Sequence, residues 1–320
     1  MPDAAFRAIG SSVPAQAGVA CAAVTRAATW GPAVAFAAIC LIWGSTFLAI
    51  KVGLASFDPF FYAGARYALA TVLTYALARA RGVRFEGPLV RWWPAFGVGV
   101  LLVAACNGMV FWAETRLDSG FTALLLTTSP VFTALLSPLL VDDPTPRSAG
   151  WLGIALGLGG TVLLVGPWRT GDLTLLPAIV AEASVVVWAV GSLWVRRIRE
   201  SFHPMALAVA QMAAGAVVLL AISAVRGRAL VGPVTGRSLA ALAYLVVFGS
   251  TVAFAAYFYL LRDWDATRAA TSTYVNTVVA LVLGVALLGE PVTWGMVFGT
   301  AVVFAGVALV LREQHGAVQT

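Results

Sequence analysis

The chain has 320 residues, of which 61% are hydrophobic and 11% charged, and its mean hydropathy is +0.92. Soluble domains are roughly half apolar and a quarter charged, so a soluble fold of this sequence would lack the polar residues needed to cover its surface. The net charge of +6 comes from arginines scattered over short loops rather than from a basic cluster. This pattern argues against nucleic-acid binding and is typical of membrane loops that set topology.

The first 31 residues are rich in alanine and contain an apolar run too short to cross a bilayer, so we expect a loose cytoplasmic tail at 1–31. Apolar stretches of about 20 residues, the length that spans the hydrocarbon core, then recur almost to the end. We predict an all-α integral membrane protein with a second cytoplasmic tail at 312–320. Its ten transmembrane helices are expected at 32–50, 60–78, 93–112, 119–140, 148–166, 174–195, 204–224, 238–260, 267–288 and 293–311.

The distribution of basic residues predicts the orientation. With the N-terminus in the cytoplasm, thirteen Lys and Arg residues fall inside, six fall outside, and Arg66 lies within a span. Cytoplasmic loops carry the excess of positive charge, so we expect both termini in the cytoplasm of a bacterial inner membrane. The loop from Arg226 to Arg237 runs against this trend, because it places three arginines outside.

The chain contains an internal duplication. Two shifts, of 145 and 147 residues, superimpose the first half on the second and bring like residues together. These pairs are Trp43 with Trp188, Pro59 with Pro204, Arg81-Gly82 with Arg226-Gly227, Asp143 with Glu290 and Pro144 with Pro291. We therefore predict two five-helix repeats, at 32–166 and 174–311. Because five is odd, the repeats are inverted in the membrane, as in many secondary transporters.

Motifs in both halves resemble a known family. Leu41-Ile42-Trp43-Gly44-Ser45-Thr46-Phe47, followed by Lys51, Pro59 and Arg66, resembles the first half of an EamA domain. The run Ser250–Leu261, with Tyr274-Val275-Asn276 and Gly289-Glu290-Pro291, resembles the second half. The chain is therefore similar, over residues 32–312, to the EamA family of the drug/metabolite transporter superfamily. It departs from the family pattern at Thr277, where a proline is usual, and at Asp142-Asp143, where an acidic residue and glycine are usual.

The resemblance implies ten helices, both ends in the cytoplasm, and a central substrate cavity between the halves. It also implies export of amino acids, other metabolites or toxic compounds, with a proton gradient as one available driving force.

Two ionisable side chains lie inside predicted spans, where a charge costs several kcal/mol and normally faces a cavity or a partner. Arg66 is expected either to bind a substrate carboxylate or hold a gate, or to pair structurally. Glu182 is the candidate for proton coupling, because burial favours its protonated form, with a structural role as the alternative. Gln211 falls at the repeat position of Arg66, so only one half keeps the charge.

Aromatic and polar residues in mid-span complete the set of substrate-binding candidates. Trp43 and Trp188 are repeat equivalents away from the membrane edges, and they either line an amphipathic pocket or pack in the core. The other polar candidates either line the same cavity or hydrogen-bond between helices. They are Asn107, Trp112, Ser250, Tyr257, Tyr274 and Asn276.

These observations favour a secondary transporter that exports amino acids or other amphipathic small molecules by alternating access. A passive channel or facilitator is the alternative, and a membrane-embedded enzyme is the third. The sequence gives little support for a membrane-embedded enzyme, because its two histidines lie outside the predicted spans, His203 in a loop and His315 in a tail. We expect no cofactor and no metal, and Cys21, Cys40 and Cys106 form no CxxC pair. The expected partners are a small-molecule substrate and the bilayer, with monomer and dimer both left open.

Overall fold

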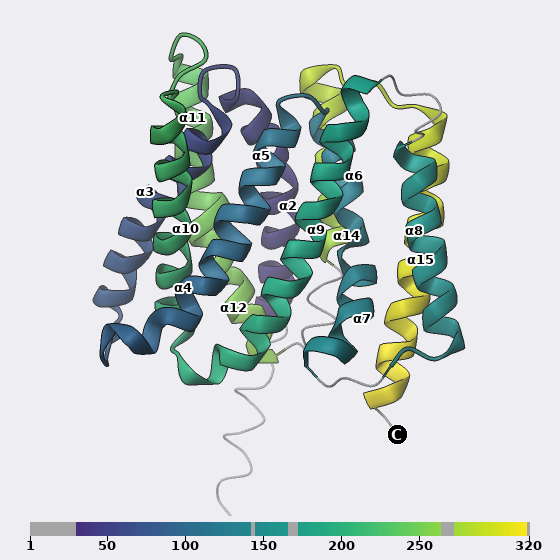
Figure 1. The fold of residues 1–320 in the computed structure, drawn as a ribbon, viewed down its shortest axis with the longest axis horizontal. Coiled ribbons are helices and arrows are strands. Elements are labelled where there is room, and N and C mark those ends of the chain that lie inside the picture. The colour runs from purple at the N-terminus through teal and green to yellow at the C-terminus, as the bar shows by residue number, and fades with distance from the viewer. Residues whose placement is uncertain (1–29, 142–144, 166–171, 264–271, 319–320) are drawn as a thin grey trace, which may run out of the picture.

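The computed structural model describes residues 30–141, 145–165, 172–263 and 272–318. These residues form a bundle of helices that run between two opposite ends (Figure 1). The first helices are α2 (Trp30–Gly53), α3 (Pro59–Ala80), η1 (Leu89–Trp92), α4 (Trp93–Gly99), η2 (Val100–Asn107), α5 (Gly108–Glu114), α6 (Ser119–Leu125), η3 (Leu126–Thr128), α7 (Ser129–Leu140) and α8 (Ser148–Val165). The remaining ones are α9 (Asp172–Ile198), η4 (Arg199–Ser201), α10 (Pro204–Arg226), α11 (Gly236–Tyr244), η5 (Leu245–Val252), α12 (Ala253–Asp263), α14 (Ser272–Leu283), η6 (Gly284–Leu288) and α15 (Trp294–Val318).

At both ends of the described chain, a helix extends into the segment that the sequence predicts to be a tail. Helix α2 begins at Trp30, inside the predicted tail at 1–31, and α15 continues to Val318, through most of the predicted tail at 312–320. Pro32 lies in the first turn of α2, where a proline is tolerated, and residues 312–318 contain no proline that would end α15. Residues 1–29 and 267–271, which belong to the predicted tail and ninth span, lie outside the described residues.

Eight helices among the described residues are long and apolar enough to cross a membrane. The protein is therefore a multi-pass membrane protein. Two predicted spans fall outside this set. Helix α3 carries Arg66, Arg79 and several tyrosines and threonines, and the helix Ser272–Leu288 is shorter than a typical span. The predicted count of ten thus stays a prediction.

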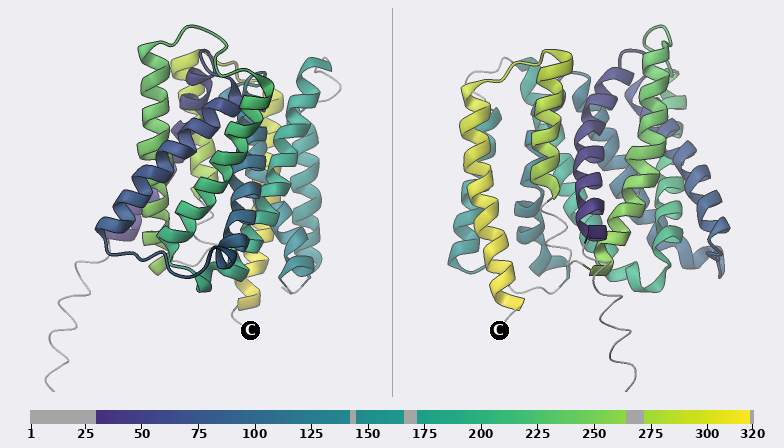
Figure 2. Two further views of the ribbon diagram at one scale, coloured as in Figure 1. Left: turned by 60° about the vertical axis from the view of Figure 1, so that its left-hand side comes forward. Right: turned by 180° about the vertical axis from the view of Figure 1, so that it is seen from behind.

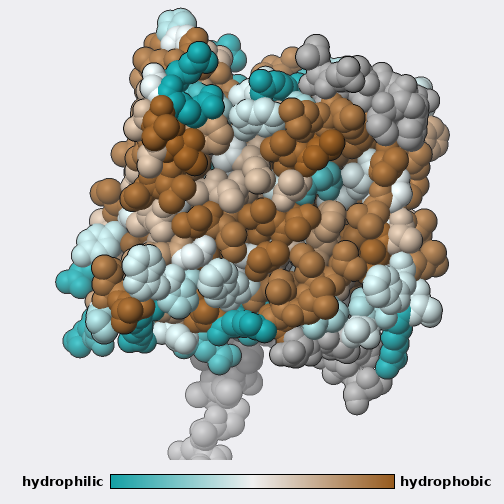
Figure 3. Space-filling model, in the orientation of Figure 1, coloured by the Kyte–Doolittle hydropathy of each residue, from teal (hydrophilic) through white to brown (hydrophobic). Residues whose placement is uncertain are grey.

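The surface agrees with a membrane environment. In Figure 3, hydrophobic side chains cover the middle of the visible face, and hydrophilic ones gather towards its upper and lower ends. Large apolar side chains such as Leu69, Leu139 and Val217 are more than half exposed. Exposing so wide an apolar band to water is unfavourable, whereas the hydrocarbon core of a bilayer is itself apolar and can surround it.

The helices of the two halves pack in corresponding pairs. Helix α3 packs against α10, and α8 runs beside α15. Helix α2 packs against α12 and α14, while α9 packs against α5 and α7. In the repeat, α2 corresponds to α9, α12 to α5 and α14 to α7. The two contacts of α2 therefore correspond to the two contacts of α9. The α3–α10 and α8–α15 contacts each join two corresponding helices. The start of α2 and the end of α15 lie at the same end of the bundle, which is the lower end in Figures 1 and 2.

Two π-helical segments occupy corresponding places. From Val100 to Leu245 and from Asn107 to Val252, the first and last residues of η2 and η5, the separation is 145 residues each time. This is the shift found in the sequence. In η2, Asn107 Nδ2 donates to Leu102 O at 2.7 Å, and in η5, Thr251 Oγ1 donates to Val246 O at 3.2 Å. Single π-turns inside α-helices are frequent at functional sites.

Candidate functional site

Arg66 reaches from the first half of the chain into the second. Asp58 and Pro59 fix the start of α3, because the Asp58 carboxylate accepts from Phe60 N at 3.0 Å. Two turns later, Arg66 Nε donates to Ser250 Oγ at 3.0 Å and Arg66 Nη2 donates to Gly249 O at 3.2 Å. The side chain thus joins α3 to the π-helical segment η5.

The Arg66 guanidinium is buried, with 5% of the residue exposed. It lies 4.8 Å from the centre of the Tyr67 ring and 5.9 Å from that of Phe111. Within the described residues, no carboxylate oxygen lies within 4.0 Å of it. A guanidinium has five N–H donors, so Arg66 retains capacity for an anionic group.

Asn107 belongs to the same cluster through a tyrosine. Tyr67 Oη donates to Asn107 Oδ1 at 2.8 Å, and Tyr67 follows Arg66 directly. The structure therefore brings together three predicted residues, Arg66, Ser250 and Asn107. Gln211, the repeat counterpart of Arg66, is buried at the contact between α10 and α4, close to Gly99.

A second pair of predicted residues meets between α2 and α12. The Trp43 ring lies 5.5 Å from the Tyr257 ring and 6.2 Å from the Phe254 ring, centre to centre. Trp43 is partly buried and comes from the first half, whereas Tyr257 comes from the second. These rings form an aromatic contact between the halves of the kind that accommodates apolar or cationic groups.

Three other predicted residues lie elsewhere. After its side-chain amide is oriented by its hydrogen bonds, Asn276 donates to Ser272 O at 2.9 Å and to Cys40 O at 3.1 Å, which ties α14 to α2. Tyr274 packs edge-on against Phe304, with ring centres 5.1 Å apart. Trp188 is 37% exposed on α9. Its repeat counterpart Trp43 instead packs against α12, so the two tryptophans share a position in the repeat but not an environment.

Glu182 lies on α9 and bonds across to the first half. Thr128 Oγ1, in the 3₁₀ turn η3 between α6 and α7, donates to Glu182 Oε2 at 3.0 Å. Glu182 Oε1 is buried and has no hydrogen-bond partner among the described residues. One oxygen of this carboxyl group is therefore satisfied and the other is not.

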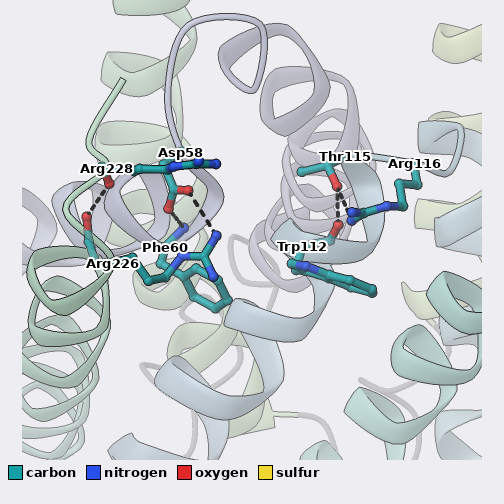
Figure 4. Close-up of polar contacts among 8 residues, drawn as sticks. Asp58, Phe60, Trp112, Thr115, Arg116, Arg226 and Arg228 are labelled. Carbon is teal, nitrogen blue, oxygen red and sulfur yellow. Dashed lines mark hydrogen bonds and ion pairs between the residues drawn. The ribbon is translucent and has the colours of Figure 1, made fainter. Parts of the chain in front are cut away.

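An apolar groove lies between α3, η2, α5, α9 and α10. It has a volume of about 380 Å³, and its lining includes Phe60, Trp112 and Met109. Two arginines cover its aromatic residues (Figure 4): Arg116 lies 4.6 Å from the Trp112 ring, and Arg226 lies 5.1 Å from the Phe60 ring. The groove itself is apolar, and a cationic group lies beside each of these two lining aromatic residues.

Arg226 also lies 3.7 Å from Asp58, as measured between Nη2 and Oδ2. This ion pair and the ring contact give the residue a structural role, although its loop runs against the charge bias predicted for the outer side.

Two charged side chains hold the short turn at 115–118, here called the α5–α6 turn, and the helix start that follows it. The Glu290 carboxylate accepts from Ser119 N and Ser119 Oγ at 2.7 Å and from Gly120 N at 2.9 Å. Lys51 Nζ donates to Glu114 O at 2.9 Å and to Leu117 O at 2.5 Å. The turn is therefore held from α2 on one side and from the second half of the chain on the other.

Sequence reasoning missed this cluster. In the sequence, Lys51 indicates a charge in an outer loop and belongs to the family motif, and Glu290 marks both the repeat and the family motif. Glu114 was not singled out, because an acidic residue at the end of an apolar run usually marks the membrane boundary. The available signal was its position: Glu114 lies two residues beyond the third predicted span, and the first three predicted spans contain no acidic residue.

Comparison with known proteins decides the family. The model of the EamA-like transporter family matches this chain twice, over residues 30–166 and 175–312. The chain belongs to the EamA-like transporter family. It is thus a membrane transporter, and its two matched regions place Arg66 in one and Ser250 in the other.

Relatives of this EamA-like protein occur in all three domains of life. It is 37% identical over 256 residues to the uncharacterized inner membrane transporter YedA of Escherichia coli K12, covering 79% of this chain and 81% of YedA. It is 24% identical to an uncharacterized transporter of Archaeoglobus fulgidus, covering 85% and 95% of the two chains. It is 26% identical to the chloroplastic WAT1-related protein At3g02690 of Arabidopsis thaliana, covering 84% and 66%.

A solved crystal structure has the same fold. It superimposes with a TM-score of 0.63 at 22% sequence identity, over 88% of this chain and 97% of the other.

Proposed function

We propose that this protein is a secondary transporter that exports small amphipathic metabolites, amino acids among them, across a bacterial inner membrane by alternating access. The observation that carries the proposal is the contact of Arg66 with Gly249 and Ser250. The contact involves a buried cation at the junction of the two family-matched regions, and no described carboxylate oxygen lies within 4.0 Å of it. A substrate carboxylate that binds this guanidinium competes with the contact between the halves, and so links binding to their movement.

We further propose ten spans in two inverted five-helix units, with both termini in the cytoplasm. Three observations support this arrangement. The π-helical segments recur after 145 residues, and the helix pairs are unchanged when the halves are exchanged. The ends of α7 and η6, which correspond in the repeat, lie at opposite ends of the bundle (Figure 1).

The proposed substrate site combines a cationic and an aromatic part. Arg66, Ser250 and Asn107 form the first, and Trp43 with Tyr257 forms the second. Trp112, in the apolar groove, offers a further surface for an amphipathic solute. The sequence offers four further candidates for this site, which are Trp188, Gln211, Tyr274 and Asn276. We also propose that the transporter is coupled to protons.

Substrate-induced stabilisation of the purified protein tests this function. A ligand that binds the folded state raises the melting temperature, so amino acids and aromatic amphiphiles are screened by thermal unfolding. We expect R66A and W43A to abolish the shift that a ligand produces, and R79A to retain it. Arg79 is an appropriate control because it is exposed on the same helix as Arg66.

Transport is then measured in proteoliposomes. The expected result is saturable efflux with counterflow, which separates a carrier from a passive channel. Two results would overturn the proposal. One is failure to move any solute, with or without a pH gradient, and the other is a full ligand-induced shift in R66A.

A further inference from the structure

Glu114 is a fully buried carboxyl group in the bundle. It is the last residue of α5, and 0% of it is exposed. Both of its side-chain oxygens lack a hydrogen-bond partner among the described residues. Glu182, the candidate chosen from the sequence, differs because one of its oxygens accepts from Thr128. Glu114 is therefore the less satisfied of the two acids.

The burial of Glu114 determines its charge in this conformation. An ionised carboxylate that is removed from water and receives no hydrogen bond costs several kcal/mol. A protonated carboxyl group avoids most of this cost, because it carries no net charge. Burial without hydrogen bonds thus favours the neutral form of Glu114 in this conformation.

Charged and titratable groups face Glu114 from each neighbouring part of the bundle. Lys51 approaches from α2, Arg66 and Tyr62 from α3, and Glu290 from the segment that follows η6. On the α5–α6 turn, Asp118 experiences the charges of Lys51 and Glu290. On α9, the carboxyl group of Glu182 is bonded to Thr128 instead.

Lys51 lies where its ammonium can compensate the negative charge of Glu114 after the carboxyl group loses its proton. Its ammonium already lies against the end of α5, where two of its three N–H donors bond to the carbonyl oxygens of Glu114 and Leu117. A rotation of this flexible side chain would bring the positive charge to the ionised carboxylate. The same rotation would release at least one carbonyl at the α5–α6 turn.

We propose that Glu114 is the site at which this transporter binds its coupling proton, and that Lys51 is the cation that compensates Glu114 when the proton leaves for water. The inference rests on the proposed transport function. It links protonation to the α5–α6 turn, which Glu290 clamps from the second half. Loss of the proton therefore loosens the turn directly before Ser119 and Gly120, where Glu290 joins the two halves, and so links protonation to the contact between them.

Infrared spectroscopy of the full chain in lipid vesicles tests the site without a known substrate. The carbonyl stretch of a protonated carboxyl group is recorded as the pH is raised. We expect a band in the wild type that is lost in E114Q and retained in E86Q. Glu86 is a suitable control because 67% of its side chain is exposed. The proposal is wrong if E114Q keeps the band, or if E182Q removes it instead.

A second variant keeps the test valid if E114Q does not fold. K51M removes the compensating cation and leaves the acid in place, so the Glu114 band should persist to higher pH than in the wild type. A band that disappears at an unchanged or lower pH would overturn the role of Lys51.

Transport measurements separate this inference from the function on which it rests. With a substrate in hand, E114Q should lose accumulation driven by a pH gradient while retaining counterflow, because exchange of substrate requires no net proton movement. Accumulation equal to that of the wild type contradicts the inference alone. A wild-type protein that moves no solute contradicts the transport function, whereas the infrared result stands independently.

Discussion

Glu290 and Ser119 lie 171 residues apart in the sequence, yet the Glu290 carboxylate accepts both the backbone N–H and the hydroxyl of Ser119 at 2.7 Å. A third bond comes from Gly120 N at 2.9 Å. The carboxylate therefore caps the N-terminus of α6, where the backbone N–H groups lack helical partners and the helix dipole favours a negative charge. One side chain of the second half thus completes a helix of the first.

Removing this cap should destabilise the protein. We expect E290A to lower the free energy of unfolding by about 3 kcal/mol, because it leaves buried donors of Ser119 and Gly120 without their acceptor. The measurement is thermal or denaturant unfolding in detergent micelles.

E290Q provides the matched comparison. It retains the size of the side chain and one acceptor oxygen, so its loss should be smaller than that of E290A. Equal stability of E290A and the wild type would contradict the capping role.

The bond between Arg66 and Ser250 gives a second stability prediction. S250A removes the acceptor of Arg66 Nε in a site where Ser250 is 0% exposed, and water cannot easily replace it. We expect a loss of about 1–3 kcal/mol, the usual cost of an unsatisfied buried donor. The exposed residue Ser201 supplies the control, since S201A should leave the unfolding curve unchanged.

Most helix positions follow from local sequence signals. The predicted second span at 60–78 lies within α3, because Asp58 and Pro59 supply a strong start signal that the structure uses. Arg66 and Ser250 were both selected because polar groups inside apolar spans need partners, and they proved to be partners of each other. Hydropathy and helix-capping patterns are local, so a single sequence reveals them.

Contacts between distant segments could not be predicted in the same way. Lys51 ends an apolar run and so resembles a boundary charge, but its ammonium bonds to the carbonyl of Glu114, 63 residues away. The repeat likewise did not reveal that Trp188 and Trp43 have different surroundings, because equal positions in two repeats need not have equal neighbours. Whether a polar group at the end of a helix contacts water or another helix depends on how the helices pack. The hydrophobic pattern of a single sequence does not reveal this packing.

The third prediction concerns stability and follows from the close packing of α8 on α15. A Cβ atom on Gly153 would lie 2.6 Å from the backbone oxygen of Gly306, which cannot move without shifting α15. We expect G153A to lower the free energy of unfolding by about 1–3 kcal/mol through overpacking. The measurement is again unfolding in micelles.

Gly159 on the same helix serves as the control. A Cβ atom there meets nothing within 4 Å, so G159A should be neutral or should stabilise the helix by up to about 1 kcal/mol. If both variants lose the same stability, the effect comes from the helix itself and not from its contact with α15.

Asp118 on the α5–α6 turn makes the stability depend on pH. Burial, and to a lesser degree the negative charge of Glu290, raises the pKa of the Asp118 carboxyl group above its ordinary value. Between the unfolded and folded pKa values, the folded protein binds more protons than the unfolded chain, so stability falls as the pH rises through this window. D118N removes the titration and keeps a residue suited to the start of a helix. We therefore expect D118N to melt at a higher temperature than the wild type above the window, and the difference to shrink as the pH is lowered through it. Melting temperatures of both proteins over a pH series measure this, and a difference that grows as the pH is lowered would contradict the assignment.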